Sequence, residues 1–293
     1  MARRGDASLA AILLTQRLVD CAAEPFRARE YWALCGQAPD LGALLGRSVD
    51  DLSTDLDPEL AARLVGRFEA ATSCAFELEK LEQLGIQVLA SVDSFYPARF
   101  LDRLGPATYS TGGAAGPIEI LDGPGFGIVG SRAVSPEGAE VAREAARRAV
   151  EHEWDVISGA SPGVDRFALE ATLEAEGRYG ALLAESLLRV TREPELRAAI
   201  GKGRLCLATP YPPAASYSVA NAKGRNKLIY ASSETTLVVA ADREQDTTED
   251  GAIHAIDHNR DVAVWTGPGA GPSNEALVAL GARPITDLDQ LWD

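Results

Sequence analysis

The sequence predicts an α/β protein with a doubly wound, mostly parallel sheet that follows an N-terminal helical region. Two observations lead to this fold class. From residue 126 onward, short apolar segments rich in β-branched residues alternate regularly with stretches of helical periodicity. Before residue 85, apolar residues recur at helical spacing and no strand pattern of any length is evident.

The alternation after residue 126 places each element in order. Buried parallel strands are expected at the short apolar segments, and helices are expected between them. The predicted strands are 126–130, 154–158, 179–184, 203–207, 235–241, 261–265 and 283–285. The predicted helices are 136–151, 164–177, 192–201, 218–232, 248–258 and 273–281.

The chain divides into three regions by this pattern. Residues 1–84 form a helical domain of SAM or helix-hairpin type, residues 85–125 form a connector, and residues 126–293 form the doubly wound domain. The clearest helical periodicity of the first region covers Ala7–Val19 and Pro58–Leu84. The role of the helical domain stays open between packing or oligomer contact and contact with DNA.

Local signals support these boundaries. Asp57 is a good N-cap and Pro58 a good first residue for the second helical stretch. In the connector, Tyr96-Pro97 precedes a short helix, and Gly112-Gly113 predicts a turn.

Composition excludes several classes of protein. The net charge of −15 argues against a general nucleic-acid binder, although a local basic groove is compatible with it. No apolar run approaches the roughly 20 residues needed to cross a membrane, so no membrane partner is expected. The cysteines lack metal-type spacing and predict free thiols in a cytoplasmic protein: Cys21, Cys35, Cys74 and Cys206.

Two strand-to-helix turns contain residues that we expect to bind an anion. Gly130, Ser131 and Arg132 follow the first predicted strand, and Ser158, Gly159, Gly163 and Asp165 follow the second. Small residues at a helix N-terminus leave backbone N–H groups free for a phosphate. Arg132 at such a position predicts an anion partner, either a phosphate or Glu137. Asp165, in the first helical turn, has either a capping or a ligand role.

A basic segment completes the predicted site. Three cations occur within five residues, in a domain that is otherwise acidic, and the segment comprises Asn221, Lys223, Arg225, Asn226 and Lys227. In a doubly wound sheet, ligands bind beyond the carboxyl ends of the strands where the strand order reverses. We therefore expect the two turns and this segment to converge there and to hold phosphates. Tyr217, in the loop before the segment, is either a stacking residue or a surface residue.

Catalytic and metal sites are not predicted. His254 and His258 are four residues apart on one predicted helix, but no third ligand with suitable spacing is present. No nucleophile elbow, Walker loop or dinucleotide fingerprint occurs. The sequence therefore predicts a binding protein with no cofactor, not an enzyme.

Several spaced motifs together resemble the DNA-processing protein A family (DprA, also called Smf). They occur in the family's order: Tyr96-Pro97, then Ile128-Val129-Gly130-Ser131-Arg132, Ser158-Gly159 with Gly163-Val164-Asp165, Arg225-Asn226-Lys227-Leu228-Ile229, and Pro272-Ser273-Asn274 with Gly281-Ala282. Ala222 stands where the family pattern has an aromatic residue, and Leu169 where it has a histidine. The chain resembles a divergent member.

The resemblance implies a Rossmann-like domain over residues 126–293 that binds single-stranded DNA without cutting it, forms a homodimer and assists a RecA-type recombinase in natural transformation. A second hypothesis is a regulator that senses a nucleotide or nucleic acid in a defence or toxin–antitoxin system, as the antitoxin of a cognate toxin. A third, a phosphoribohydrolase, lacks the expected Gly-Gly-x-Gly-Thr loop.

Overall fold

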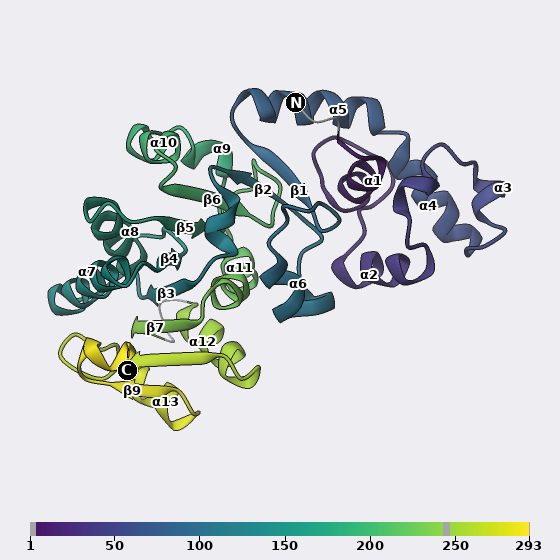
Figure 1. The fold of residues 1–293 in the computed structure, drawn as a ribbon. Helices are drawn as coiled ribbons and strands as arrows, with labels where there is room; N and C mark the ends of the chain where they lie inside the picture. Colours follow the sequence, from purple (N-terminus) through teal and green to yellow (C-terminus); the bar gives the residue numbers. More distant parts are fainter. Residues whose placement is uncertain (1–3, 243–246, 293) are drawn as a thin grey trace. The chain divides into compact units, whose positions relative to one another are not determined.

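The computed structural model describes residues 4–242 and 247–292, and the chain forms two compact units. Unit 1 extends to Ala114 and includes Pro210–Pro212. Unit 2 consists of Ala115–Thr209 and the chain from Pro213 onward. Each unit is described separately below, and Figure 1 identifies its elements.

Unit 1 is mainly helical. Asp57 caps α4 as predicted, because its carboxylate accepts hydrogen bonds from the backbone N–H groups of Glu59 and Leu60. The Pro58–Leu84 stretch forms two helices instead of one, because the helical conformation is interrupted at Glu69 and Ala70. The elements are α1 (Asp6–Thr15), α2 (Ala28–Gln37), α3 (Val49–Leu52), α4 (Pro58–Phe68), α5 (Ala71–Gln83), β1 (Gln87–Ala90), α6 (Ala98–Leu104) and β2 (Thr111–Ala115).

Two further expectations in this unit are wrong: the helical stretch expected at Ala7–Val19 ends at Thr15 in α1, and a predicted turn is a strand. Gly112 and Gly113 were expected in a turn, but they lie within β2, which pairs antiparallel with β1. Leu89 is opposite Gly112 and Val88 is opposite Gly113. The partner strand satisfies the backbone groups of the two glycines, and a local sequence signal does not reveal that pairing.

Unit 2 contains a seven-stranded run of parallel strands in the order β6-β5-β4-β3-β7-β8-β9. This order, with helices between successive strands, confirms the predicted doubly wound α/β fold. The strands are β3 (Gly125–Gly130), β4 (Asp155–Ser158), β5 (Tyr179–Leu182), β6 (Leu205–Thr209), β7 (Thr235–Ala240), β8 (Asp261–Trp265) and β9 (Arg283–Ile285). The helices are α7 (Pro136–Glu151), α8 (Val164–Glu174), α9 (Leu187–Val190), α10 (Pro194–Gly201), α11 (Val219–Ser232), α12 (Thr248–Asp257) and α13 (Asn274–Ala279).

The predicted boundaries in unit 2 agree with these elements to within a few residues. The prediction 136–151 coincides with α7. Helix α8 ends at Glu174, three residues earlier than predicted. Glu176 then has a φ of +60°, a left-handed conformation that terminates a helix.

Helices cover both faces of the central strands. Figure 1 shows α7 and α8 on one side of β3 and β4, with α11 on the other. Helix α7 is able to lie close to its neighbours because its inward face is made of alanines, among them Ala142, Ala145 and Ala149, which are fully buried. Residues Val156–Ile157 of β4 and Leu237–Val239 of β7 are fully buried as well. Burial on both faces explains why these strands read as continuous apolar runs.

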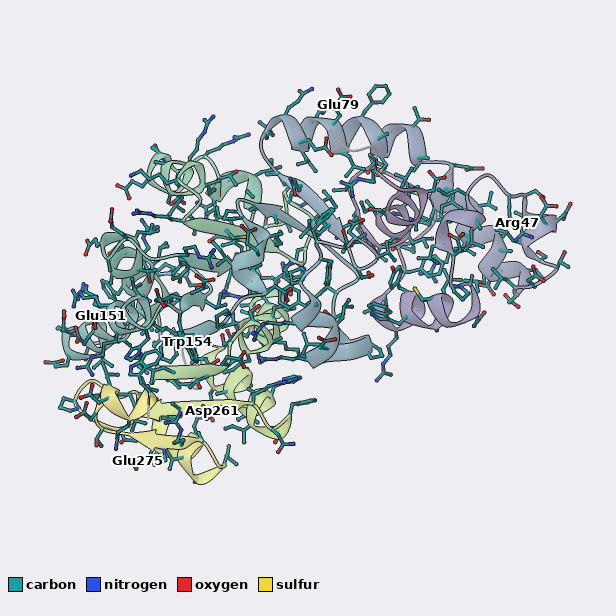
Figure 2. The ribbon with its side chains drawn as sticks, viewed as in Figure 1. Arg47, Glu79, Glu151, Trp154, Asp261 and Glu275 are labelled. Atoms are coloured by element: carbon teal, nitrogen blue, oxygen red, sulfur yellow. The ribbon has the colours of Figure 1, made fainter. Side chains whose placement is uncertain are left out.

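Several acidic residues of unit 2 lie on its exposed surface. Glu151 at the end of α7, Asp261 at the start of β8 and Glu275 on α13 are exposed, and Figure 2 shows their side chains on these elements. The negative charge of these residues therefore faces solvent. Any anion site in unit 2 depends on a local group of cations.

Candidate anion-binding site

A cavity of about 320 Å³ opens at the carboxyl edge of the parallel strands in unit 2. It lies beside the end of β3, the strand at which the sheet order reverses: β4, β5 and β6 follow on one side, and β7, β8 and β9 on the other. Doubly wound sheets bind ligands at this position. The end of β3, the β4–α8 loop, α11 with the residues before it, and the start of α12 form the walls.

The turn after β3 is held by its main chain. The Ser131 N–H donates to the Ala240 carbonyl (2.8 Å), and the Ser131 carbonyl accepts from the Val164 N–H (3.2 Å). A β-carbon on Gly130 would lie 2.6 Å from the Val164 side chain, so this close approach requires glycine. Ser131 is only 4% exposed. It therefore fixes the turn and does not line the cavity.

Arg132 projects from this turn into the exposed part of the cavity. Its guanidinium carbon lies 4.5 Å from the centre of the Tyr217 ring, a cation–π geometry. Within residues 4–242 and 247–292, no carboxylate forms an ion pair with Arg132 (the salt bridges of this region all involve other residues). The expected alternative partner, Glu137, is not paired with it. Arg132 is exposed at the cavity.

The β4–α8 loop is a tight structural turn. Gly163 has a φ of +87°, and a β-carbon there would lie 2.3 Å from the Ser131 carbonyl oxygen. Ser158 is fully buried, and Gly159 is buried beside it. These residues bring α8 against the β3 turn, and none of them lines the cavity.

Arg225 and Asp165 form a buried charged pair. Arg225 is 3% exposed and Asp165 is 6% exposed. The Arg225 guanidinium donates to the Leu182 carbonyl (2.5 Å) and to the Ser161 hydroxyl (3.3 Å). The Asp165 carboxylate accepts from the Ser161 N–H (3.3 Å). Burial raises the pKa of Asp165, and the positive charge of Arg225 opposes that rise.

This pair depends on Gly159. A β-carbon at that position would lie 1.6 Å from an Arg225 guanidinium nitrogen and 2.6 Å from an Asp165 carboxylate oxygen. Gly159, which the sequence predicts as a phosphate contact, makes room for this guanidinium. Arg225 links α11 to the end of β5 and to the β4–α8 loop. It belongs to the cavity wall, but its hydrogen bonds are directed inward.

The remaining residues of the basic segment lie on α11 and differ in their surroundings. Lys223 lines the cavity, is about half exposed at 52%, and forms an ion pair of 2.6 Å with Asp250. The Asn226 amide donates to the Thr247 carbonyl (3.1 Å) and so connects α11 to the start of α12. Lys227 lies outside the cavity. Burial lowers the pKa of His254, and the positive charge of Lys227 lowers it further.

The structure therefore brings half of the predicted residues to one cavity. Six line it: Gly130, Arg132, Asp165, Lys223, Arg225 and Asn226. Six lie around it without lining it: Ser131, Ser158, Gly159, Gly163, Asn221 and Lys227.

Sequence reasoning missed several residues that α11 and the start of α12 contribute. The cavity also includes Thr247, Thr248 and Asp250, and Val219 and Tyr230 on α11. Thr247 and Thr248 lie at the start of α12, so their place at the N-terminus of a predicted helix was a usable signal.

The described residues hold neither a candidate metal site nor a membrane-spanning helix. Among residues 4–242 and 247–292, no group of three or more His, Cys, Asp or Glu side chains is placed to hold a metal ion. In the same part of the chain, no helix combines the length and apolarity that crossing a membrane requires.

The fold and the cavity define a class: a doubly wound, Rossmann-like domain with a partly cationic cavity at its switch point. Comparison with known families then identifies the chain. The model of the family described as DNA recombination-mediator protein A matches residues 87–293, and the chain belongs to this family. The resemblance deduced from the sequence motifs is thereby confirmed.

Curated relatives are distant. DNA processing protein DprA of Bacillus subtilis is 25% identical over 187 residues, which are 61% of this chain and 62% of the relative. Protein Smf of Synechocystis is 28% identical over 179 residues, 57% of this chain and 43% of the relative. The matches thus span less than two thirds of either relative's own length.

Solved structures share the fold. DprA of Streptococcus pneumoniae has a TM-score of 0.67 at 19% identity and aligns over 91% of this chain and 97% of its own. DprA of Helicobacter pylori, described for its single-stranded DNA binding mode, has a TM-score of 0.56 at 19% identity, over 70% of this chain and 93% of its own.

Proposed function

We propose that this protein binds single-stranded DNA at the unit 2 cavity and acts without catalysis as an accessory factor in DNA processing and recombination. Membership of the recombination-mediator family supports the process. The fold shared with a DprA described for single-stranded DNA binding supports the ligand class. The observation that carries the assignment is Arg132, exposed at the switch point and without a carboxylate partner in the described chain.

The burial of each residue indicates whether it contacts the ligand or supports the cavity wall. Arg132 and Lys223 are exposed and contact phosphates in this proposal, whereas Arg225, Asp165 and Gly159 hold the wall in place. Phosphate contacts supply affinity without base specificity. Because the chain carries a net charge of −15, we expect binding to be weak at high salt and strengthened markedly at low salt.

Fluorescence anisotropy with a labelled oligothymidylate tests the proposal. The parent protein should bind, and each lost phosphate contact should reduce the salt slope by about 0.7. Arg132→Ala should weaken binding about 10- to 100-fold, since a charged hydrogen bond contributes about 1.5–3 kcal/mol. Arg197→Ala is the matched control, because Arg197 is an exposed arginine on α10 outside the cavity.

Two results would count against the proposal. If the parent protein does not bind at low salt, single-stranded DNA is not the ligand. If Arg132→Ala and Arg197→Ala bind as tightly as the parent, with unchanged melting curves, the DNA interface lies elsewhere.

A nucleotide-sensing regulator is the second candidate, and the cavity size favours it. A volume of about 320 Å³ is at the lower end of small-molecule pockets, which measure about 300–1,000 Å³. A mononucleotide that displaces the labelled oligomer at micromolar concentration, with longer strands no better, would support this function. An antitoxin role would further require a toxin partner that copurifies with the chain.

The homodimer and the RecA-type recombinase stay predictions. Sedimentation equilibrium at several protein concentrations tests the first. Loading of a recombinase onto DNA in the presence of the parent protein, compared with Arg132→Ala, tests the second.

A further inference from the structure

One aromatic side chain stands exposed at the rim of the cavity. Tyr217 is 42% exposed and precedes α11, and Val219, two residues later, is 56% exposed. Both line the cavity. Single exposed aromatic residues are common on protein surfaces and need no explanation alone. The surroundings of Tyr217 distinguish it from such residues.

The backbone that carries Tyr217 is fixed. Ser218 caps α11, because its hydroxyl accepts a hydrogen bond from the Asn221 N–H (3.0 Å). The Asn221 side-chain amide donates to the Ser216 carbonyl (3.2 Å). These two bonds flank Tyr217 on either side, so the start of α11 holds the ring at a defined place on the rim.

The ring itself is oriented by a cation. The Arg132 guanidinium lies against one face of Tyr217, with 4.5 Å between the guanidinium carbon and the ring centre. The cavity beside the ring has an apolar wall that includes Val129, Ala222 and Ile229. An aromatic ring, an apolar wall and two exposed cations within one cavity match the parts of a nucleotide, which has a flat apolar base and a charged phosphate.

We propose that Tyr217 stacks on an unpaired base of the bound strand while Arg132 and Lys223 hold the neighbouring phosphates. This inference rests on the proposed function and specifies its ligand. A base in a duplex is already stacked on both sides, so a stacking ring at the rim selects a single strand over a duplex. Every base has a π-face, so the contact does not discriminate among base sequences.

Two variants and two oligomers test the inference. Tyr217→Leu removes the ring, and Tyr217→Phe keeps it. The oligomers are an oligothymidylate and an abasic deoxyribose-phosphate strand of the same length and charge. The parent should bind the thymidylate more tightly than the abasic strand. Tyr217→Leu should lose about 5- to 100-fold in affinity for the thymidylate and little for the abasic strand. Tyr217→Phe should retain the preference.

The outcomes separate this inference from the function on which it rests. Failure of the parent to bind either strand overturns the proposed function. Binding of both strands by the parent with equal affinity overturns the stacking contact and leaves the phosphate site standing. An equal loss for both strands in Tyr217→Leu also overturns stacking, because it indicates a general disturbance of the rim. If Tyr217→Leu does not fold, Tyr217→Gln, which also removes the ring, takes its place in the same comparison of the two strands.

Discussion

Replacing Arg225 with alanine tests whether this residue is part of the framework or a ligand contact. The substitution removes two hydrogen bonds, to the Leu182 carbonyl and the Ser161 hydroxyl, and leaves the buried Asp165 carboxylate without its positive neighbour. Removal of one partner of a buried pair destabilises a protein by about 3–5 kcal/mol, because the other charge stays buried. We expect Arg225→Ala to lose about this much of its free energy of unfolding at neutral pH.

Urea denaturation followed by tryptophan fluorescence measures this loss. Of the four tryptophans, Trp154, Trp265 and Trp292 belong to unit 2, so the signal reports mainly on the unit that contains the pair. A double-mutant cycle with Asp165→Asn isolates the interaction. The double variant should lose less stability than the sum of the two single variants, since neither charge is then left buried alone.

The loss of unfolding free energy in Arg225→Ala should also depend on pH. Because burial raises the pKa of Asp165, the native protein takes up a proton at this group at a higher pH than the unfolded chain does. The group therefore lowers stability as the pH rises through its native pKa. Without Arg225 the pKa of Asp165 rises further, so Arg225→Ala should recover part of its lost stability as the pH is lowered from neutrality and the carboxylate takes up a proton.

Two results would refute this reasoning. A loss below about 1 kcal/mol at neutral pH would show that Arg225 behaves as an ordinary surface residue, for which changes are usually within about 0.5 kcal/mol. An identical pH dependence in Arg225→Ala and the parent would show that Asp165 does not respond to its neighbour.

Two further substitutions probe the same wall and the cavity mouth. Gly159→Ala should destabilise unit 2 by about 1–3 kcal/mol in thermal melts, because its β-carbon would lie 1.6 Å from an Arg225 nitrogen, whereas Gly201→Ala, with open space around it, should not destabilise. An unchanged melting temperature in Gly159→Ala would contradict the packing described here. Asp250→Asn releases Lys223 from its ion pair, and DNA affinity should rise about fivefold at low salt and converge with the parent at high salt. A drop in affinity would mean that Asp250 positions Lys223 instead of competing for it.

The fold of unit 2 was predictable because each strand is buried on both faces. Such strands leave an uninterrupted apolar run in the sequence, and the helices between them have their own periodicity. The same reasoning did less well in unit 1. Helix α2 (Ala28–Gln37) buries only two of its residues, Tyr31 and Leu34, so it left little apolar periodicity to detect. Strand β2 was missed because its glycines gave a turn signal.

The site was predictable in location but not in the roles of its residues. The switch-point rule placed Arg132 and Lys223 at one edge, and both line the cavity. The same basic segment also supplied Arg225 and Lys227, which the sequence treats as equivalent to Lys223. Successive residues of a helix point about 100° apart, so residues 223, 225 and 227 face different surroundings. Only the packing of α11 determines which of them meets solvent.

The sequence by itself determined the alternation of strands and helices, the family, and the edge of the sheet at which the cavity lies. These properties are local or follow from strand order, and they leave a periodic record in the chain. The tertiary structure alone decided that Arg225 is paired inside with Asp165, that Asp250 reaches Lys223, and that Tyr217 stands under Arg132 at the rim. Those contacts join residues 27 to 85 positions apart, and no local pattern encodes which side chains meet across a folded core.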